Sequence, residues 1–212
     1  PELAAAWQAR GGAPGQSESV GGVDAAKRVA AGEAFDVVFL ASDAVDKLLA
    51  AGHALPGSRV DLVRSGVAVA VKQGVARPDI SSEEAVKQAV LAAPTIGYST
   101  GPSGTALLKL FERWGIAEEV KQRTVQAPPG VPVGSLVAKG EVALGFQQFS
   151  ELMNLEGVTV LGALPEAIQI NTVFSGAVCA AAAQPQAVRG LLAFMASAET
   201  ADLKRRCGMD AA

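Results

Sequence analysis

The chain has 212 residues, of which 50% are hydrophobic and 18% are charged. This composition excludes disordered and collagen-like chains and suits one large or two small globular domains. The 18 basic and 21 acidic residues give a net charge of −3. The basic residues form no stripe along the sequence, which argues against a nucleic-acid partner.

The sequence contains no candidate membrane span and no candidate metal site. The longest nearly uncharged apolar stretches, 67–71 and 174–183, fall short of the roughly 18 to 20 residues that cross a bilayer. The single histidine and the absence of a Cys-x-x-Cys spacing exclude a zinc cage. Cys179 and Cys207 are compatible with one disulfide and also with two buried thiols. We expect any secretion signal to have been removed ahead of Pro1.

The first part of the chain alternates apolar segments of helical and of strand spacing. Leu3, Ala6 and Trp7 repeat at helical spacing. The fully apolar run 35–41 lies between turn residues and predicts a strand buried on both faces. In chain order we predict a helix over 2–10, a strand over 17–20, a helix over 23–31, a strand over 35–41, a helix over 42–52 and a strand over 60–72.

The alternation continues beyond residue 80. Ser81 followed by Glu84 predicts a capping box at a helix start, and Gly115 predicts the end of a later helix. We predict a helix ending at 93, a strand over 95–99, a helix over 105–114, a strand near 124, a helix ending at 139 and a strand over 142–146. A long extended segment over 169–183 and two helices, over 187–197 and 199–207, complete the chain.

Alternating strands and helices predict parallel sheets covered by helices on both faces. Because a long strand returns late and only helices follow it, we expect the end of the chain to pack onto the first half. The sequence therefore predicts an α/β protein with two lobes, one formed by 1–78 and 170–212 and the other by 79–169. The chain is expected to cross between the lobes near 72–80 and near 168–174.

Four loops of small or amide-bearing residues follow predicted strands. In open α/β sheets, ligands bind beyond the carboxyl ends of the strands, where helix N-termini present free N–H groups. Asp43 is the only charged residue in these loops, so the loops offer hydrogen-bond donors suited to an anion. The candidate ligand-binding residues are Gly21, Gly22, Ser42, Ser99, Gly101, Ser103, Gly104, Thr105, Gln147 and Gln148.

Two of these loops also have a purely structural interpretation. The Gly-Pro-Ser-Gly segment at 101–104 lacks the lysine of a Walker loop, and its spacing alone is slightly more typical of an ordinary helix start capped by Ser103. Gln147 and Gln148 carry neutral amides that are costly to bury without partners. A solvent-facing loop is therefore the alternative to a binding site there.

Arg64 and Ser65 interrupt an apolar strand and are further candidate ligand-binding residues. A buried guanidinium needs a partner, which a ligand carboxylate held by two hydrogen bonds would supply. An internal salt bridge with Asp61 or Glu18 is the alternative. No catalytic residue is predicted, because His53 follows a helix and no Gly-x-Ser-x-Gly elbow is present.

Four segments, in this order and spacing, resemble a known protein family. They read RSGVAVAVK over 64–72, IGYSTGPSG over 96–104, GEVALGFQQFSEL over 140–152 and LPEAIQINTVFSGAV over 164–178. The sequence is similar to bacterial extracellular solute-binding proteins of type II, in the branch related to periplasmic molybdate-binding proteins. One relative in this branch is an aconitate isomerase. The resemblance covers nearly the whole chain.

The resemblance implies the type II periplasmic binding protein fold, with two lobes joined by crossing strands and a ligand in the cleft. It implies a periplasmic, monomeric protein without a cofactor that captures a small anion, an organic acid or an oxyanion, for the membrane subunits of an ABC-type transporter. In the molybdate-binding relatives a tyrosine in the loop matching 145–148 contacts the anion, and this sequence has Gln148 there. The family opens with a strand and a serine-bearing loop that we expect ahead of Pro1.

Two other functions remain as alternatives. An isomerase of a small polycarboxylate would use the same cleft and would need a group that moves a proton beside an activated carbon. The sequence displays the anion-binding loops well and a proton-transfer group poorly. A cytoplasmic ligand-sensing domain would require a fused DNA-binding or signalling segment, which these 212 residues do not contain.

Overall fold

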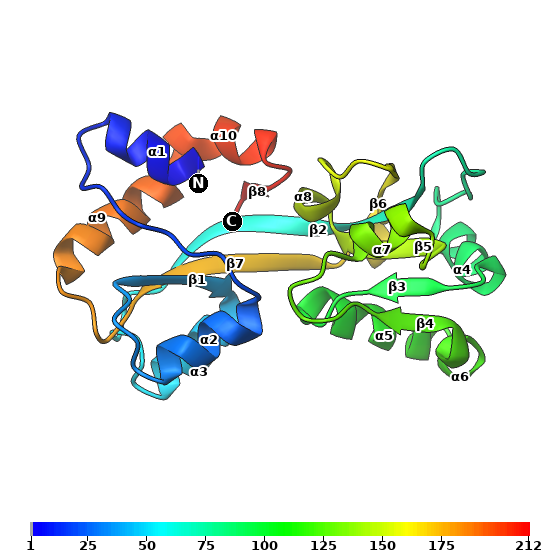
Figure 1. Ribbon diagram of the computed structural model, residues 1–212, viewed down its shortest axis with the longest axis horizontal. Coiled ribbons are helices and arrows are strands. Elements are labelled where there is room, and N and C mark those ends of the chain that lie inside the picture. The colour runs from blue at the N-terminus through cyan, green and yellow to red at the C-terminus, as the bar shows by residue number, and fades with distance from the viewer. Residues whose placement is uncertain (1) are drawn as a thin grey trace. The chain divides into compact units, whose positions relative to one another are not determined.

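The computed structural model describes residues 2–212, which form two compact units. Unit 1 comprises the residues up to Arg64 together with Thr172–Ala212, and unit 2 comprises Ser65–Asn171. The chain passes from one unit to the other within β2 (Val60–Lys72) and at the start of β7 (Asn171–Val178). Unit 1 is therefore built from two distant parts of the sequence, which carry the two ends of the colour scale in Figure 1.

Unit 1 carries helices on both faces of its strands. Besides β2 and β7, its elements are α1 (Glu2–Ala9), α2 (Gly22–Ala30), β1 (Val37–Ala41), α3 (Ser42–Ala50), α9 (Pro185–Ala196), the 3₁₀ turn η3 (Ala198–Thr200), α10 (Ala201–Arg206) and β8 (Asp210–Ala211). Alternate side chains of a strand point to opposite faces. Leu40 of β1 accordingly packs with α2 and α3, which lie beside β1 in Figure 1, whereas Val37 packs with α9.

Unit 2 contains a mixed sheet. Besides β2, its elements are α4 (Glu83–Ala92), β3 (Ile96–Tyr98), α5 (Pro102–Arg113), α6 (Ala117–Val120), η1 (Lys121–Arg123), β4 (Thr124–Gln126), α7 (Val133–Lys139), β5 (Leu144–Gln148), α8 (Phe149–Leu152), β6 (Val158–Ala163) and η2 (Glu166–Ile168). β3 pairs parallel with β4 and with β5, and β2 pairs antiparallel with β5 and with β6.

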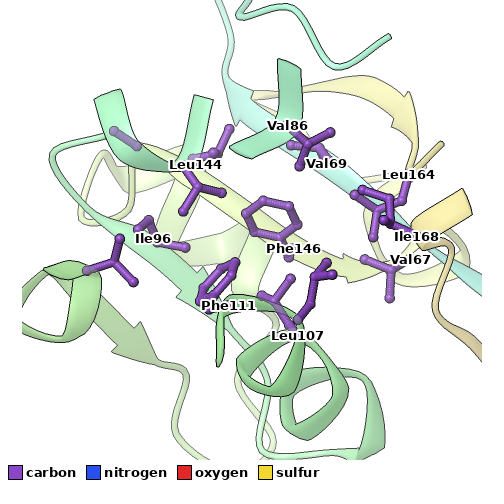
Figure 2. Close-up of a cluster of buried hydrophobic side chains, with 14 of the residues drawn as sticks. Val67, Val69, Val86, Ile96, Leu107, Phe111, Leu144, Phe146, Leu164 and Ile168 are labelled. Carbon is purple, nitrogen blue, oxygen red and sulfur yellow. The ribbon is translucent and has the colours of Figure 1, made fainter. Parts of the chain in front are cut away.

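The main core of unit 2 is built around two aromatic rings. Phe111 of α5 is 1% exposed, and its ring meets the ring of Phe146 edge-on at 6.4 Å between centroids. Trp114 stacks on Phe111 at 6.0 Å. Figure 2 shows Phe111 and Phe146 surrounded by aliphatic side chains such as Ile96 and Leu144. This cluster fixes α5 against β3 and β5, and so fixes the loops that follow these two strands.

The mixed α/β architecture agrees with the prediction, and most predicted strands and helices are present. Strand β2 has the predicted bounds. The expectation of parallel sheets fails for two pairs in unit 1, because β1 is antiparallel to β7 and β2 is antiparallel to β8. No single strand-helix-strand crossover connects β1 to β7, since the chain between them includes nearly all of unit 2, so the preference for parallel pairing does not apply.

Three local predictions were wrong. Residues 17–20 form no strand. They are exposed, and their backbone does not pair with the sheet. Helix α5 begins at Pro102 and not at 105, since proline suits the first position of a helix. Ser82, and not Ser81, caps α4 by accepting a hydrogen bond from the Ala85 N–H at 3.1 Å. Ala85 therefore occupies the position where a capping box needs glutamate.

The two cysteines lie in unit 1, and both are free thiols, so the disulfide interpretation is wrong. Cys179 is buried, and this burial raises the pKa of its thiol to about 11. Cys207 is half-buried, and burial together with the nearby Glu2 carboxylate raises its pKa as well. Both thiols are thus poorly ionised at neutral pH, which keeps them unreactive. Within residues 2–212, no helix is long and apolar enough to cross a membrane.

Lys204 of α10 is a buried amine that has no hydrogen-bond partner among residues 2–212. Desolvation lowers the pKa of Lys204, so the folded state binds this proton less tightly than the unfolded state does. The free energy of unfolding therefore rises as the pH increases toward 10.5, the usual pKa of a lysine side chain. We expect Lys204→Met to raise the free energy of unfolding by about 1 to 3 kcal/mol at neutral pH, with a smaller gain at alkaline pH.

Urea titrations of wild type and variant at several pH values measure this effect. Lys109→Met, at an exposed position of α5, is the control and should change stability by about 0.5 kcal/mol or less. A loss of stability in Lys204→Met at neutral pH would contradict the assignment of Lys204 as an unpaired amine.

Candidate functional site

In unit 1, Ser42 is the first residue of α3 and directly follows β1. Its half-buried hydroxyl lies 3.0 Å from the Val173 carbonyl oxygen and 2.7 Å from Ser175 Oγ. Ser175 is fully buried and donates to Asp61 Oδ1 at 2.6 Å. That hydrogen bond, with the Arg59 guanidinium as a further cause, lowers the pKa of Asp61. Ser42 is thus the outer end of a chain of hydrogen bonds that leads to an ionised carboxylate.

The first turn of α2 approaches the same end of β1. The Gly21 carbonyl accepts hydrogen bonds from the N–H groups of Asp24 and Ala25, both at 2.9 Å. A Cβ atom on Gly22 would lie 3.7 Å from a methyl group of Leu40 in β1. Helices α2 and α3 also contact each other. The structure therefore brings the predicted Gly21–Gly22 turn close to the strand that ends at Ser42.

In unit 2, the loop between β3 and α5 forms a compact turn. Ser99 Oγ lies 3.1 Å from Ser103 Oγ, and Ser103 is only 3% exposed. The Gly101 carbonyl accepts from the Gly104 N–H at 3.1 Å and from the Thr105 N–H at 3.3 Å. Gly104 approaches the backbone so closely that a Cβ atom there would lie 1.9 Å from the Ser99 carbonyl oxygen. Thr105 is exposed. It therefore contributes less to this turn than the four other predicted residues, which are Ser99, Gly101, Ser103 and Gly104.

At the end of β5, Gln147 and Gln148 are 4% and 5% exposed, which overturns the solvent-facing alternative. Gln147 Oε1 accepts from the Gly134 N–H at 3.4 Å. Buried Ser65 places its Oγ 3.2 Å from Ser150 Oγ in α8. The amides are tolerated inside the protein because the fold supplies polar partners.

The two candidate groups of unit 2 follow neighbouring parallel strands. Gly97 of β3 lies opposite Gly145 of β5. Since the carboxyl ends of parallel strands meet at one edge of a sheet, the Ser99–Thr105 turn and the Gln147–Ser150 segment share that edge. Seven of the predicted residues in unit 2 therefore lie at the carboxyl ends of its parallel strands, namely Ser99, Gly101, Ser103, Gly104, Thr105, Gln147 and Gln148.

Arg64 does not fit the interpretation given to it. It is exposed, although its neighbours Val63 and Ser65 are buried, so the guanidinium needs no partner to be accommodated. Neither suggested ion pair forms within residues 2–212, because Asp61 pairs with Arg59 and Glu18 pairs with Arg28. The physical argument for Arg64 as an anchor of a carboxylate is therefore lost.

Sequence reasoning missed several polar residues at these sites. Ser175 contacts Ser42 from 133 residues away along the chain, and Ser150 contacts Ser65 from 85 residues away. Asp61 accepts from Ser175 across 114 residues. Glu151 is exposed as a residue, yet its carboxyl is desolvated, which raises its pKa, while a hydrogen bond from Gln147 acts in the opposite sense. The motif over 140–152 contained this carboxylate, so the local sequence could have indicated it.

The pockets of the two units lie elsewhere. A pocket of about 530 Å³ in unit 1 is lined by residues such as Trp7, Phe194 and Glu199, and a pocket of about 210 Å³ in unit 2 is lined by residues such as Lys109 and Arg113. None of the predicted site residues lines either pocket. The candidate site is accordingly defined by its hydrogen-bonding groups at strand ends.

The chain is 41% identical over 177 residues to an aconitate isomerase from a Pseudomonas species, which covers 82% of this chain and 66% of that protein. The chain thus spans slightly less than two thirds of the length of this relative.

Solved structures show the same fold at low sequence identity. The Azotobacter vinelandii periplasmic molybdate-binding protein has a TM-score of 0.78 and 20% identity, with 98% of this chain and 92% of that chain covered. The tungstate-binding protein TupA from Desulfovibrio alaskensis G20 has a TM-score of 0.64 and 15% identity, with 95% and 86% covered. A family model described as bacterial extracellular solute-binding protein matches residues 1–210. The chain therefore belongs to the family of bacterial extracellular solute-binding proteins.

Proposed function

We propose that this protein captures a small anion, an organic acid or an oxyanion, in the periplasm and delivers it as a monomer to the membrane subunits of an ABC-type transporter. The observation that carries the proposal is the turn at Ser99–Thr105, where the hydroxyls of Ser99 and Ser103 lie 3.1 Å apart at the start of the twelve-residue helix α5. Free N–H groups and the helix dipole favour a negative charge at such a position.

The site residues of unit 1 complete the proposal. Ser42, Gly21 and Gly22 lie at the starts of α3 and α2, where backbone N–H groups are also free of helical partners. In unit 2, Ser65 of β2 and the two amides Gln147 and Gln148 at the end of β5 add buried polar groups. Arg64 has no structural argument in its favour, and we assign it no role in the proposed site.

A thermal-shift panel of carboxylates and oxyanions tests this function. A ligand that binds only the folded state and is present at one hundred times its Kd stabilises that state by about 2.7 kcal/mol. We expect one or more anions to raise the melting temperature of wild type and to lose this effect in Ser103→Ala. Ser197→Ala, whose hydroxyl bonds only to the Phe194 carbonyl in α9, is the control. A complete panel without any shift would reject the proposed function.

An isomerase acting on a small polycarboxylate is the second candidate. It is favoured by the similarity to an aconitate isomerase. Desolvation also raises the pKa of the Glu151 carboxyl, and carboxyl groups are among the side chains that transfer protons in catalysis. Proton NMR of cis-aconitate and trans-aconitate incubated with the protein separates the two functions. Interconversion by wild type that disappears in Glu151→Gln would support the isomerase over the binding protein.

A further inference from the structure

The hydroxyl of Ser42 is surrounded on its inner side by hydrogen-bond acceptors. The Val173 carbonyl oxygen, 3.0 Å away, can only accept. Ser175 Oγ, 2.7 Å away, has a single proton, and the 2.6 Å hydrogen bond to Asp61 Oδ1 uses it. Toward Ser42, Ser175 therefore also acts as an acceptor. A serine carries one hydroxyl proton, so the proton of Ser42 is committed to these two oxygens.

Asp61 enforces this direction of donation. An ionised carboxylate accepts hydrogen bonds and donates none. The hydrogen bond from Ser175 and the Arg59 guanidinium both lower the pKa of Asp61, so the carboxylate stays ionised across the neutral range and Ser175 cannot reverse its proton. Arg59 also contacts both carboxylate oxygens of Asp46, at 2.7 and 2.8 Å, which holds the guanidinium in place.

The hydroxyl pair of unit 2 behaves differently. Ser99 and Ser103 share one hydrogen bond, and either oxygen can be its donor. Two hydroxyls carry two protons, so one proton of this pair remains available to a ligand. The turn in unit 2 can therefore donate to an anion, whereas Ser42 in unit 1 offers lone pairs.

We propose that Asp61 is a positioning residue that acts through Ser175 to make Ser42 a hydrogen-bond acceptor toward the ligand, and that the ligand is accordingly an organic acid carrying a hydroxyl group. This inference rests on the proposed anion-binding function and narrows its ligand class. A ligand oxygen without a proton would be a third acceptor competing for the single Ser42 proton. A ligand hydroxyl can instead donate its own proton to a lone pair of Ser42. A carboxylate group of the same ligand accepts from the free N–H groups at the N-termini of α2 and α3.

Calorimetric titration with pairs of acids that differ in one hydroxyl tests the inference. Malate with succinate, citrate with tricarballylate, and lactate with propionate are the probes. For the pair that fits the site, we expect the hydroxy acid to bind wild type about tenfold more tightly than its partner, the effect of one well-placed hydrogen bond. In Ser42→Ala this ratio should fall to about one, because the variant has removed the acceptor.

Asp61→Ala and Asp46→Ala form a matched pair that isolates the positioning role. Each variant removes one carboxylate that contacts Arg59, but only Asp61 contacts Ser175. In Asp61→Ala, Ser175 can donate to Ser42, which removes one of the two acceptors that compete for the Ser42 proton. The ratio should therefore fall severalfold, and the acid without a hydroxyl should bind more tightly than it does to wild type. Asp46→Ala should keep the ratio of wild type. A merely structural role of Asp61 would weaken both acids alike.

The outcomes separate this inference from the proposed function. If no acid and no oxyanion binds wild type, the proposed function fails and the inference fails with it. If acids bind without a preference for the hydroxyl, or if the preference survives in Ser42→Ala, the binding function stands and the assignment of Ser42 as an acceptor is overturned. A ratio in Asp61→Ala equal to that in Asp46→Ala would overturn the role of Asp61.

Discussion

Replacing Phe111 by alanine is expected to lower the free energy of unfolding by about 3 to 5 kcal/mol. Phe111 is 1% exposed and contacts two other aromatic rings, those of Trp114 and Phe146. Its removal leaves a cavity that the rigid surroundings of α5 and β5 fill only in part, so the lost contacts and the cavity both destabilise unit 2. Urea denaturation followed by tryptophan fluorescence and by circular dichroism measures the change.

Phe149→Ala is the matched control for this cavity. Phe149 is also an aromatic residue of unit 2, but it is 38% exposed. Its truncation removes fewer packed atoms, and we expect a loss of about 1 kcal/mol or less. Equal losses in the two variants would contradict the description of Phe111 as the centre of the core.

Gly104→Ala is expected to destabilise the protein by about 1 to 3 kcal/mol, the usual cost of overpacking, and to weaken binding of any anion found in the panel by about tenfold or more. The new Cβ atom would lie 1.9 Å from the Ser99 carbonyl oxygen. Because that oxygen belongs to the backbone, no side-chain rotation relieves the clash and the turn must move. Movement of the turn separates the hydroxyls of Ser99 and Ser103, which removes the donor that the ligand needs.

Gly101→Ala tests whether any methyl group in this loop has the same effect. A Cβ atom on Gly101 would lie 3.8 Å from Ser99 Oγ, and the residue has a φ of −81°, which alanine adopts without strain. We expect wild-type stability in this variant, because the new methyl group meets no backbone atom within 4 Å. Thermal unfolding and calorimetric titration of both variants give the comparison. Intact affinity in Gly104→Ala would show that the turn is not part of the binding site.

The pattern of apolar residues was sufficient to predict that β1 and β2 are strands. The expectation that both faces of 35–41 are buried is wrong, because Phe39 is 44% exposed. The run 35–41 and the segment 60–72 have no competing interpretation, and β1 and β2 occupy them. Strand β6 was missed because its residues are half-buried and lack an alternating pattern. The two-residue strand β8 was missed because only its pairing with Val63 and Arg64 defines it. Such pairing depends on contacts between distant segments, which local spacing does not contain.

The same distinction explains the outcome at the candidate site. Strand-end serines and glycines were found because the ends of strands and the starts of helices can be recognised locally. Arg64 was misjudged because its sequence neighbours are apolar, although the side chain itself faces outward. The partners Ser175 and Asp61 were not found, since nothing in the sequence indicates that a serine in a late strand donates to an aspartate 114 residues earlier.

The split composition of unit 1 has a consequence for the order in which the protein forms during synthesis. Unit 2 is one continuous segment, Ser65–Asn171, and can fold as soon as it leaves the ribosome. Strand β1 must wait for β7, and Ser42 meets Ser175 across a separation of 133 residues. The loop that this contact closes is long, so its formation is slow compared with that of local contacts. The hydroxyl that is proposed to select the ligand is therefore oriented only once β7 has been synthesised, after the whole of unit 2 has left the ribosome.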